Sequence, residues 1–347
     1  MVDYYNFMGN TTFTPTPLFG ALTDFSIAIT PLLYFLVLTL SCVIIISQKK
    51  YILLSFIGIW IVFIFFEFNA LQPYFYQYLL FAGALIFFNS DKERRFVLKI
   101  IFASIYLWAG VHKLSPFYFY EICPELIRNS NFQLEAVLLE FMSFSAPFIE
   151  IGIGLLILIN KWHKLTRIII LCFHIGVVYT IVFVFKFNYI IVPWNIAMIA
   201  FGILLVRPIT MSSKFSLKSG IFILLFSVLL PAVNLIKPQL SYFSWNVYSG
   251  TVPSASLYFH KSYQYDVPES MQECILIQDD WCTVNLVTYS IYEGEIAITP
   301  EIFNFQRIAK SYCRYFPPGS EYAVQIITYS NFTRKEEWYD WNQLQKF

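Results

Sequence analysis

Charged residues are scarce in this sequence, at 13% of its 347 residues. Soluble domains carry roughly 25% charged residues. The formal net charge is only +1, which argues against the strongly basic surface that nucleic-acid binding requires. The opening residues, MVDYYNFMGNTTFTPTP, contain no Lys or Arg, so the basic region of a cleavable signal peptide is missing. We therefore expect the first apolar run to remain as a membrane anchor.

Apolar residues dominate the composition instead, at 58%, with a mean hydropathy of +0.60. Aromatics reach 20%, which fits a membrane protein with aromatic belts at both interfaces. A water-soluble core cannot bury this much apolar surface, so we expect an integral membrane protein with the lipid bilayer as its first partner. A bilayer core needs about 20 mostly apolar residues per helix. Runs of this kind predict eight spans, with seven or nine as alternatives, at 25–47, 51–69, 72–89, 95–112, 146–160, 165–187, 190–206 and 220–236.

Basic residues in the loops predict the orientation of these spans, because they concentrate on the cytoplasmic side. One set of alternate loops holds Lys49, Lys50, Lys92, Arg94, Arg95, Lys99, Lys161, Lys164, Arg167, Arg207, Lys214 and Lys218. The opposite set holds Lys113, Arg128, Lys186 and Lys237. Both termini and Lys113 are therefore expected on the outer side, either of a bacterial cytoplasmic membrane or of the endoplasmic reticulum in a eukaryote.

The composition changes at about residue 239. The stretches at 289–300 and 321–330 are rich in β-branched and aromatic residues and predict strands. Between them, 299–313 has apolar residues at helical spacing after a Thr-Pro start signal. The predicted fold class is an all-α polytopic membrane bundle followed by a small extracytoplasmic α+β domain. Its parts are an outer N-terminal segment at 1–24, the bundle at 25–236 and the α+β domain at 239–347.

Four cysteines are expected outside the membrane, where disulfides form. Four cysteines allow three pairings, and the sequence does not choose among them. The favoured pair is Cys274 with Cys282, because these residues flank ILIQDDW in an expected hairpin. The four are Cys123, Cys274, Cys282 and Cys313.

Polar side chains inside the spans are expensive and usually face a cavity or a partner. In the predicted topology they lie in the middle or outer half of the membrane, which suggests one polar pocket. Four of them also have a structural interpretation. Lys113 can be a snorkelling anchor and Glu67 an interface residue. His174 can form an interhelical hydrogen bond, and Glu150 can form a purely structural pair with His174 or Lys113. Gly152 and Gly154 are expected to permit close helix packing. The polar set is Glu67, His112, Lys113, Glu150, His174 and Asn195.

Such a pocket suits proton transfer, because a lysine removed from water can act as a general base near neutral pH. A hydrophobic acid such as a hydroquinone fits apolar walls, and a His and a Glu can orient its ring or relay protons. Histidines and carboxylates are too few at ligand spacing to predict a metal site. The candidate catalytic residues are Lys113, His112, His174 and Glu150. The candidate cofactor-binding residues are Asn195, Trp194 and Trp108.

The segment FASIYLWAGVHKLSPFYF (102–119) resembles that of vitamin K-dependent γ-carboxylases and the related HTTM membrane domain, where an Ala-Gly-hydrophobic-basic-Lys-Leu run closes a helix. IEIGIGLLILIN and IIILCFHIGVVY resemble that family's glycine-containing helix and the next helix with its internal His, here His174. The resemblance implies that Lys113 is the base that deprotonates a vitamin K hydroquinone. It departs from the pattern at His112, where the carboxylases have another lysine, and in its shorter C-terminal domain. DoxX/MauE-like redox-associated membrane proteins share a similar pattern, so the subgroup stays open.

Three functions compete on these grounds. The first is a quinol-linked or oxygen-linked modifying enzyme with Lys113 as its base. The second is a non-catalytic envelope maturation factor or complex subunit, for which the distantly similar lipase maturation factors are a precedent. It would hold an extracytoplasmic protein partner through residues 239–347. The third is a transporter, which the lack of repeat symmetry and of paired broken helices disfavours.

Overall fold

The chain is known here through a computed structural model. It describes residues 16–19, 22–47, 49–124, 136–159, 161–185, 189–208, 216–236, 241–246, 249–294, 297–330 and 333–346. Most of the 1–24 segment lies outside these ranges, as do four residues used to predict the orientation: Arg128, Lys186, Lys214 and Lys237.

The chain folds as two compact units. The sheet unit comprises Met1–Phe75, Pro253–Thr328 and Arg334–Phe347, and the bundle unit comprises Tyr76–Val252 and Tyr329–Thr333. The first two helices therefore pack with the sheet, although their composition is that of membrane helices. The composition predicts a different boundary, between residues 236 and 239, which separates the residues in lipid from those outside it. This boundary stays a prediction.

The sheet unit begins with a helical hairpin of α2 (Thr23–Ile46) and α3 (Lys50–Phe66), followed by a 3₁₀ turn at Phe68–Ala70. One stripe of α2 is buried, and its spacing of four, three and four residues follows the helical period. Other apolar side chains of α2, such as Leu32 and Phe35, are exposed, as expected for a helix that faces lipid. The buried stripe is Ser26, Thr30, Leu33 and Val37.

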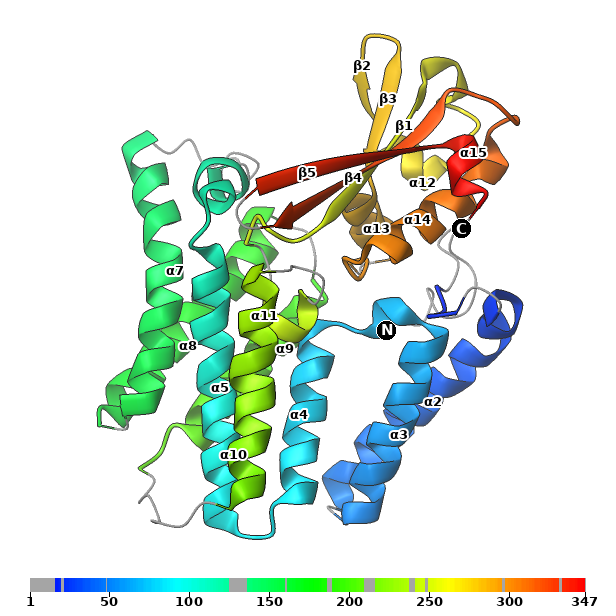
Figure 1. The fold of residues 1–347 in the computed structure, drawn as a ribbon. Helices are drawn as coiled ribbons and strands as arrows, with labels where there is room; N and C mark the ends of the chain where they lie inside the picture. Colours follow the sequence, from blue (N-terminus) through cyan, green and yellow to red (C-terminus); the bar gives the residue numbers. More distant parts are fainter. Residues whose placement is uncertain are drawn as a thin grey trace. The chain divides into compact units, whose positions relative to one another are not determined.

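The rest of the sheet unit is built on a five-stranded sheet of order β2-β3-β1-β4-β5 (Figure 1). The strands are β1 (Ser254–His260), β2 (Leu276–Gln278), β3 (Trp281–Asn285), β4 (Tyr322–Ser330) and β5 (Thr333–Asp340). The pairs β2–β3, β3–β1 and β1–β4 are antiparallel. Central strand β1 alternates strictly, with Ala255, Leu257 and Phe259 buried, so one face of the sheet covers a core.

Helices α13 (Leu286–Gly294) and α14 (Ile302–Tyr312) supply the other side of that core. Two short helices complete the unit, α12 (Glu269–Gln272) and α15 (Trp341–Leu344). The predicted strand at 321–330 is confirmed as β4, and the predicted helix at 299–313 is confirmed as α14. The predicted strand at 289–300 is wrong, because residues 286–294 form α13. Leu286 and Tyr289, three residues apart on this helix, are both fully buried, and core packing overrides the strand-like composition.

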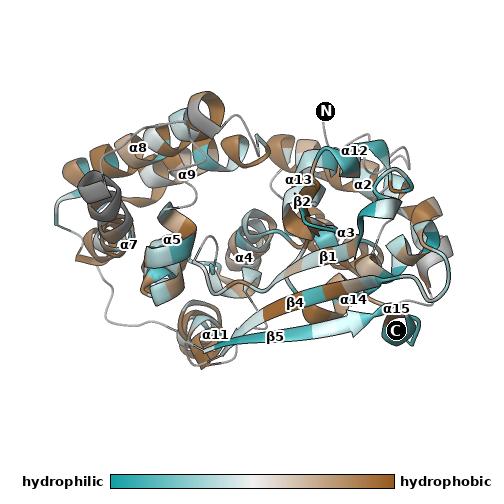
Figure 2. Ribbon diagram, turned by 90° about the horizontal axis from the view of Figure 1, so that it is seen from above, coloured by the Kyte–Doolittle hydropathy of each residue, from teal (hydrophilic) through white to brown (hydrophobic). Residues whose placement is uncertain are grey.

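The bundle unit contains the remaining helices. They are α4 (Pro73–Phe87, from Tyr76 onward in this unit), α5 (Asp91–Lys113), α7 (Ala136–Ile159), α8 (His163–Tyr179), α9 (Ile191–Leu205), α10 (Leu217–Ile223) and α11 (Leu230–Ile236). The described residues include three π-helical stretches, Tyr118–Ile122, Thr180–Phe185 and Leu224–Leu229, and the last joins α10 to α11. Apolar residues predominate on α8 and α9, whereas β5 of the sheet unit is largely hydrophilic (Figure 2).

All eight apolar runs found in the sequence lie on helices. In the described ranges, four helical segments are long and apolar enough to cross a membrane: Phe25–Ile46, Asp91–Lys113, His163–Phe183 and Leu217–Ile236. Four shorter apolar helices accompany them, at Lys50–Phe66, Pro73–Phe87, Phe144–Ile159 and Ile191–Leu205. These helices support a membrane protein, and the full count of eight spans remains a proposal.

Helices α5 and α7 approach each other closely through glycines. A Cβ atom on Gly110 of α5 would lie 2.5 Å from the carbonyl oxygen of Pro147, and one on Gly154 of α7 would lie 2.6 Å from Cγ of Leu107. Small residues at such positions let helix backbones pack tightly. The prediction of close packing is confirmed for Gly154 and wrong for Gly152, where a Cβ would meet no atom within 4 Å.

Candidate functional site

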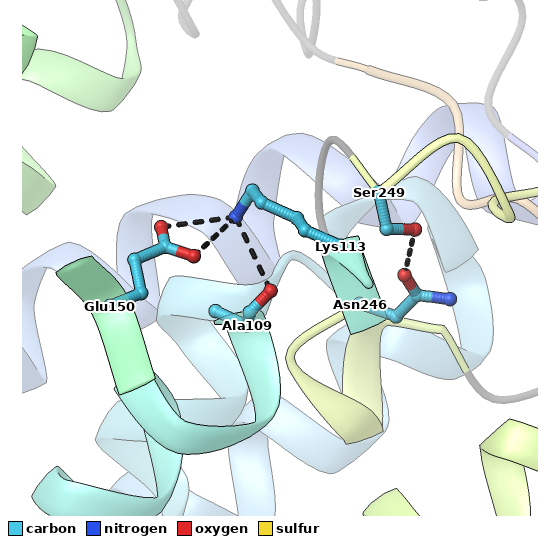
Figure 3. Close-up of polar contacts among 5 residues, drawn as sticks. All are labelled: Ala109, Lys113, Glu150, Asn246 and Ser249. Atoms are coloured by element: carbon cyan, nitrogen blue, oxygen red, sulfur yellow. Dashed lines mark hydrogen bonds and ion pairs between the residues drawn. The ribbon is translucent and has the colours of Figure 1, made fainter. Parts of the chain in front are cut away.

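An ion pair joins the last turn of α5 to α7. The Nζ atom of Lys113 lies 2.7 and 3.0 Å from the two carboxylate oxygens of Glu150, and 3.4 Å from the carbonyl oxygen of Ala109 (Figure 3). The two side chains are only 10% and 14% exposed. The contact at Gly110 brings the two helix backbones together one turn before Lys113, which is why residues 37 positions apart can pair.

The N–H donors of Lys113 all have hydrogen-bond acceptors in this structure. An ammonium group has three donors and no acceptor. In this structure the donors of Lys113 have three acceptor atoms, two on Glu150 and one on Ala109. Lys113 therefore has no lone pair with which to accept a proton from a substrate in this state. Removing either partner of a buried ion pair costs about 3–5 kcal/mol, so the pair is a fixed element of the site.

His174 of α8 sits in a second polar group. Its Nδ1 lies 2.7 Å from Oδ1 of Asn195 on α9, and its Nε2 lies 2.7 Å from the hydroxyl of Tyr106 on α5. Nδ2 of Asn195 donates to the carbonyl of Ile191 at 2.8 Å, which fixes the orientation of the amide. Nδ1 of His174 must then carry the proton, and Tyr106 donates to Nε2. With a neutral imidazole, every donor in this series of hydrogen bonds therefore has an acceptor.

No hydrogen bond joins these two polar groups among the described residues. Tyr106 and Lys113 lie seven residues apart on one face of α5, which corresponds to about 10 Å of helix rise. The structure thus brings Lys113 to Glu150 and His174 to Asn195, and it does not join them into one cluster. Tyr106 was missed in the sequence, although its position two turns before Lys113 on the same face is a signal that points to it.

His112 is buried, with 4% exposure, and has a different environment from Lys113. The backbone of Ser244 hydrogen-bonds its ring. The N–H of Ser244 already donates to Ser241 at 3.2 Å, so the carbonyl of Ser244 is the partner and the histidine is the donor. The Nε2 atom of His112 has no hydrogen-bond partner within the described ranges. With Nδ1 donating, Nε2 presents a buried lone pair that can accept a hydrogen bond.

The two predicted cofactor-binding tryptophans hold neighbouring elements together. Trp108 donates from Nε1 to the carbonyl of Ser227 at 2.8 Å, and its ring centroid lies 5.8 Å from that of His112. Trp194 of α9 donates to Gln77 of α4 at 2.8 Å. Trp108 therefore lies beside the His112 ring.

Glu67 lies in the sheet unit, directly after α3. Its carboxylate accepts hydrogen bonds from the backbone N–H of Asn69 at 2.9 Å and from the backbone N–H and hydroxyl of Thr16, each at 3.3 Å. Asn69 in turn accepts from the backbone of Thr299 at 3.0 Å and from Asn304 at 2.8 Å. Glu67 thus helps to join the helical hairpin to α14 within the sheet unit.

The disulfide prediction is wrong in this structure, because all six cysteines are free thiols. The expected hairpin exists as β2–β3, but Cys282 stands opposite Ile277, three residues beyond Cys274. Cys282 also points into the core of the sheet unit. Burial raises the pKa of the Cys282 thiol, and burial raises that of Cys313 to about 11, so the reactive thiolate forms of both are disfavoured.

Comparisons of the chain with protein-family models, with curated proteins and with solved structures found no match. In the part of the chain that the structure describes, no three His, Cys, Asp or Glu side chains come together as a metal site. A functional proposal therefore rests on the geometry of the bundle unit and on the resemblance at 102–119.

Proposed function

We propose that this chain is a membrane enzyme whose helical bundle binds a hydrophobic acid of the hydroquinone type and removes its proton. In this proposal the chain has eight spans, with both termini and the α+β domain outside the cytoplasm. His112 accepts the proton, and the Lys113–Glu150 pair supplies fixed charge beside it. The observation that carries the proposal is the buried Nε2 of His112, which has no partner in the described ranges.

A buried polar atom without a hydrogen bond costs roughly 1–3 kcal/mol, so each such atom needs an explanation. A ligand hydroxyl that donates to His112 Nε2 would remove this cost. A hydroquinone would supply a weakly acidic hydroxyl on a flat apolar ring. The indole of Trp108, 5.8 Å from the His112 ring, offers such a ring an aromatic neighbour.

The neighbouring Lys113–Glu150 ion pair affects the energy of the positive charge that His112 acquires when it takes up a proton. When His112 takes up a proton it becomes an imidazolium directly next to the ammonium of Lys113 in the sequence. The carboxylate of Glu150, held 2.7 Å from that ammonium, offsets the repulsion. The Lys113 ammonium in turn favours an anion in the same region.

This division of roles differs from that implied by the γ-carboxylase resemblance, in which Lys113 is the base. The geometry favours His112, because the donors of Lys113 already have acceptors and Nε2 of His112 has an open lone pair. His174, with both ring nitrogens bonded to Tyr106 and Asn195, positions helices α5, α8 and α9 around the site.

The test uses the full-length chain purified in detergent and a naphthohydroquinone as the probe. Binding is followed by tryptophan quenching, and deprotonation by the red-shifted absorbance of the hydroquinone anion. We expect His112→Gln to bind the probe within a few-fold of the parent and to lose the anion absorbance. The matched control is His163→Gln at the start of α8, which should keep both signals.

Three outcomes discriminate. An unchanged anion signal in His112→Gln would remove the base role from His112. An anion signal lost in Lys113→Met and kept in His112→Gln would return that role to Lys113. No probe binding by the parent protein, together with no lipid-soluble ligand in its mass spectrum, would reject the enzyme proposal altogether.

The second candidate function is a non-catalytic envelope protein that holds a partner through its α+β domain. One specific observation favours it: strand β2 at the sheet edge carries the exposed apolar residues Leu276 and Ile277. In this case Lys113→Met and His112→Gln would leave the biological function unchanged.

A further inference from the structure

The five-stranded sheet has two edge strands of opposite character. At one edge, β5 carries charged residues of both signs along its exposed length. Arg334 pairs with Glu336 at 2.8 Å, and Lys335 pairs with Glu337. Charged side chains on an edge strand block pairing with another chain. The β5 edge is therefore protected.

The β2 edge lacks such protection. It pairs only with β3 in the described sheet, so its outer row of backbone groups faces away from the sheet. All three residues of β2 are exposed, including Leu276 at 66% and Ile277 at 50%. Trp281 of β3, which stands opposite Gln278 of β2, is 41% exposed. A short apolar strand stands open at this edge.

Acidic residues outnumber basic ones in the part of the chain that contains this open edge. From residue 261 to 293 the chain has one basic residue, Lys261, against six acidic ones: Asp266, Glu269, Glu273, Asp279, Asp280 and Glu293. Asp279 and Asp280 form the exposed turn between β2 and β3. Burial and then the charges of Glu273 and Glu293 raise the pKa of the Cys274 thiol, which places two carboxylates close to the start of β2. Negative charge therefore lies at both ends of the strand.

We propose that the β2 edge binds an extended segment of a cationic, apolar polypeptide, which adds to the sheet as a sixth strand. The free backbone row of β2 supplies main-chain hydrogen bonds, Ile277 contacts the apolar side chains on one face of the added strand, and the carboxylates at each end pair with Lys or Arg. This proposal does not rest on the proton-transfer function, and either can fail while the other stands.

The same charges argue against two other occupants. A second copy of this edge would bring acidic rims together, and like charges in juxtaposition are unfavourable. A membrane surface that contains anionic lipid attracts basic segments rather than acidic ones. A cationic peptide is the partner that satisfies both the apolar strand and its charged surroundings.

Fluorescence anisotropy with the full-length chain in detergent tests the proposal. The probes are two labelled eight-residue peptides, one alternating Lys with Val and the other alternating Glu with Val. We expect the Lys peptide to bind at least about tenfold more tightly than the Glu peptide, with affinity that falls as salt is raised. Equal binding of the two peptides, or binding of neither, would overturn the proposal.

Variants locate the site. Ile277→Thr keeps a β-branched residue in the strand and removes apolar contact, and Asp279→Asn removes one charge at a left-handed position that Asn tolerates. Each should weaken binding of the Lys peptide several-fold. Glu321→Gln, an equal change of charge at an exposed position before β4, should leave it unchanged. Equal effects of Asp279→Asn and Glu321→Gln would contradict a site at β2.

Two further readouts separate strand addition from other modes of contact. A carbonyl-labelled Lys peptide should show the infrared amide band of an extended strand when bound, and a bound but disordered peptide would refute strand addition. Trp281 fluorescence, assigned with a Trp281→Phe variant, reports on lipid in nanodiscs. Quenching of Trp281 by brominated lipid without peptide binding would assign the patch to the membrane surface instead.

Discussion

Substitution of Gly110 by alanine should separate helices α5 and α7 and disturb the ion pair next to them. The added Cβ would lie 2.5 Å from the carbonyl oxygen of Pro147 and 2.7 Å from Cγ1 of Ile151. Ordinary carbon contacts lie at about 3.5–4.0 Å, so α7 must retreat by about 1 Å. Glu150 lies on α7 between these two contacts, and its distances of 2.7 and 3.0 Å to Lys113 should lengthen accordingly.

Overpacking of this kind costs roughly 1–3 kcal/mol. We expect a lower midpoint of thermal unfolding for Gly110→Ala, measured in detergent by the loss of the monodisperse peak in size-exclusion chromatography. The control is Gly152→Ala on α7, where the new methyl group meets no atom within 4 Å. If both variants unfold at the parent's temperature, or both are lowered equally, the close approach of α5 and α7 is not what limits stability.

Three further predictions address the rest of the molecule. Tyr106→Phe leaves a nitrogen of buried His174 without its 2.7 Å partner and should cost about 1–3 kcal/mol in thermal unfolding. Tyr76→Phe should not destabilise the protein, because the buried Tyr76 hydroxyl that it removes has no partner within the described ranges. Burial raises the pKa of Glu301 from 4.5 to about 8, so the folded state holds this proton more tightly. The contribution of Glu301 to stability should be fully present below pH 4.5 and be lost as pH rises to 8, and Glu301→Gln should remove that loss in unfolding curves from pH 5 to 9. Alkylation of the denatured, unreduced protein should label six thiols by mass, and a shortfall of two would restore a disulfide such as one at Cys282.

Local composition carried most of the fold prediction. Each apolar run became a helix, because the hydropathy of about 20 consecutive residues is a local property that needs no knowledge of distant contacts. The strand β4 and the helix α14 followed from their periodicity for the same reason. The segment at 289–300 failed because aromatic and β-branched residues suit both a strand and a buried helix face. The burial of Leu286 and Tyr289 against the sheet decided for the helix.

Individual candidate residues were visible in the sequence, but their partners were not. His112, Lys113, Glu150 and His174 stand out because titratable groups are rare in apolar runs. Which of them pair depends on which helices touch, and Gly110 sets the one contact that joins Lys113 to a residue 37 positions away. The hydroxyl of Tyr106 completes the His174 chain from a third helix, and only the packing of α5 near α8 brings the two side chains together.

The sequence by itself determined that this is an apolar, mostly helical chain suited to a membrane, with a small mixed domain at its end. These properties follow from sums over neighbouring residues. Only the tertiary structure decided that Lys113 donates to Glu150, that His112 keeps an open lone pair, and that Cys282 is buried three residues out of register with Cys274. Each of these depends on a contact between remote segments, and a hydrogen bond or a disulfide forms only when both of its partners are brought within a few ångströms.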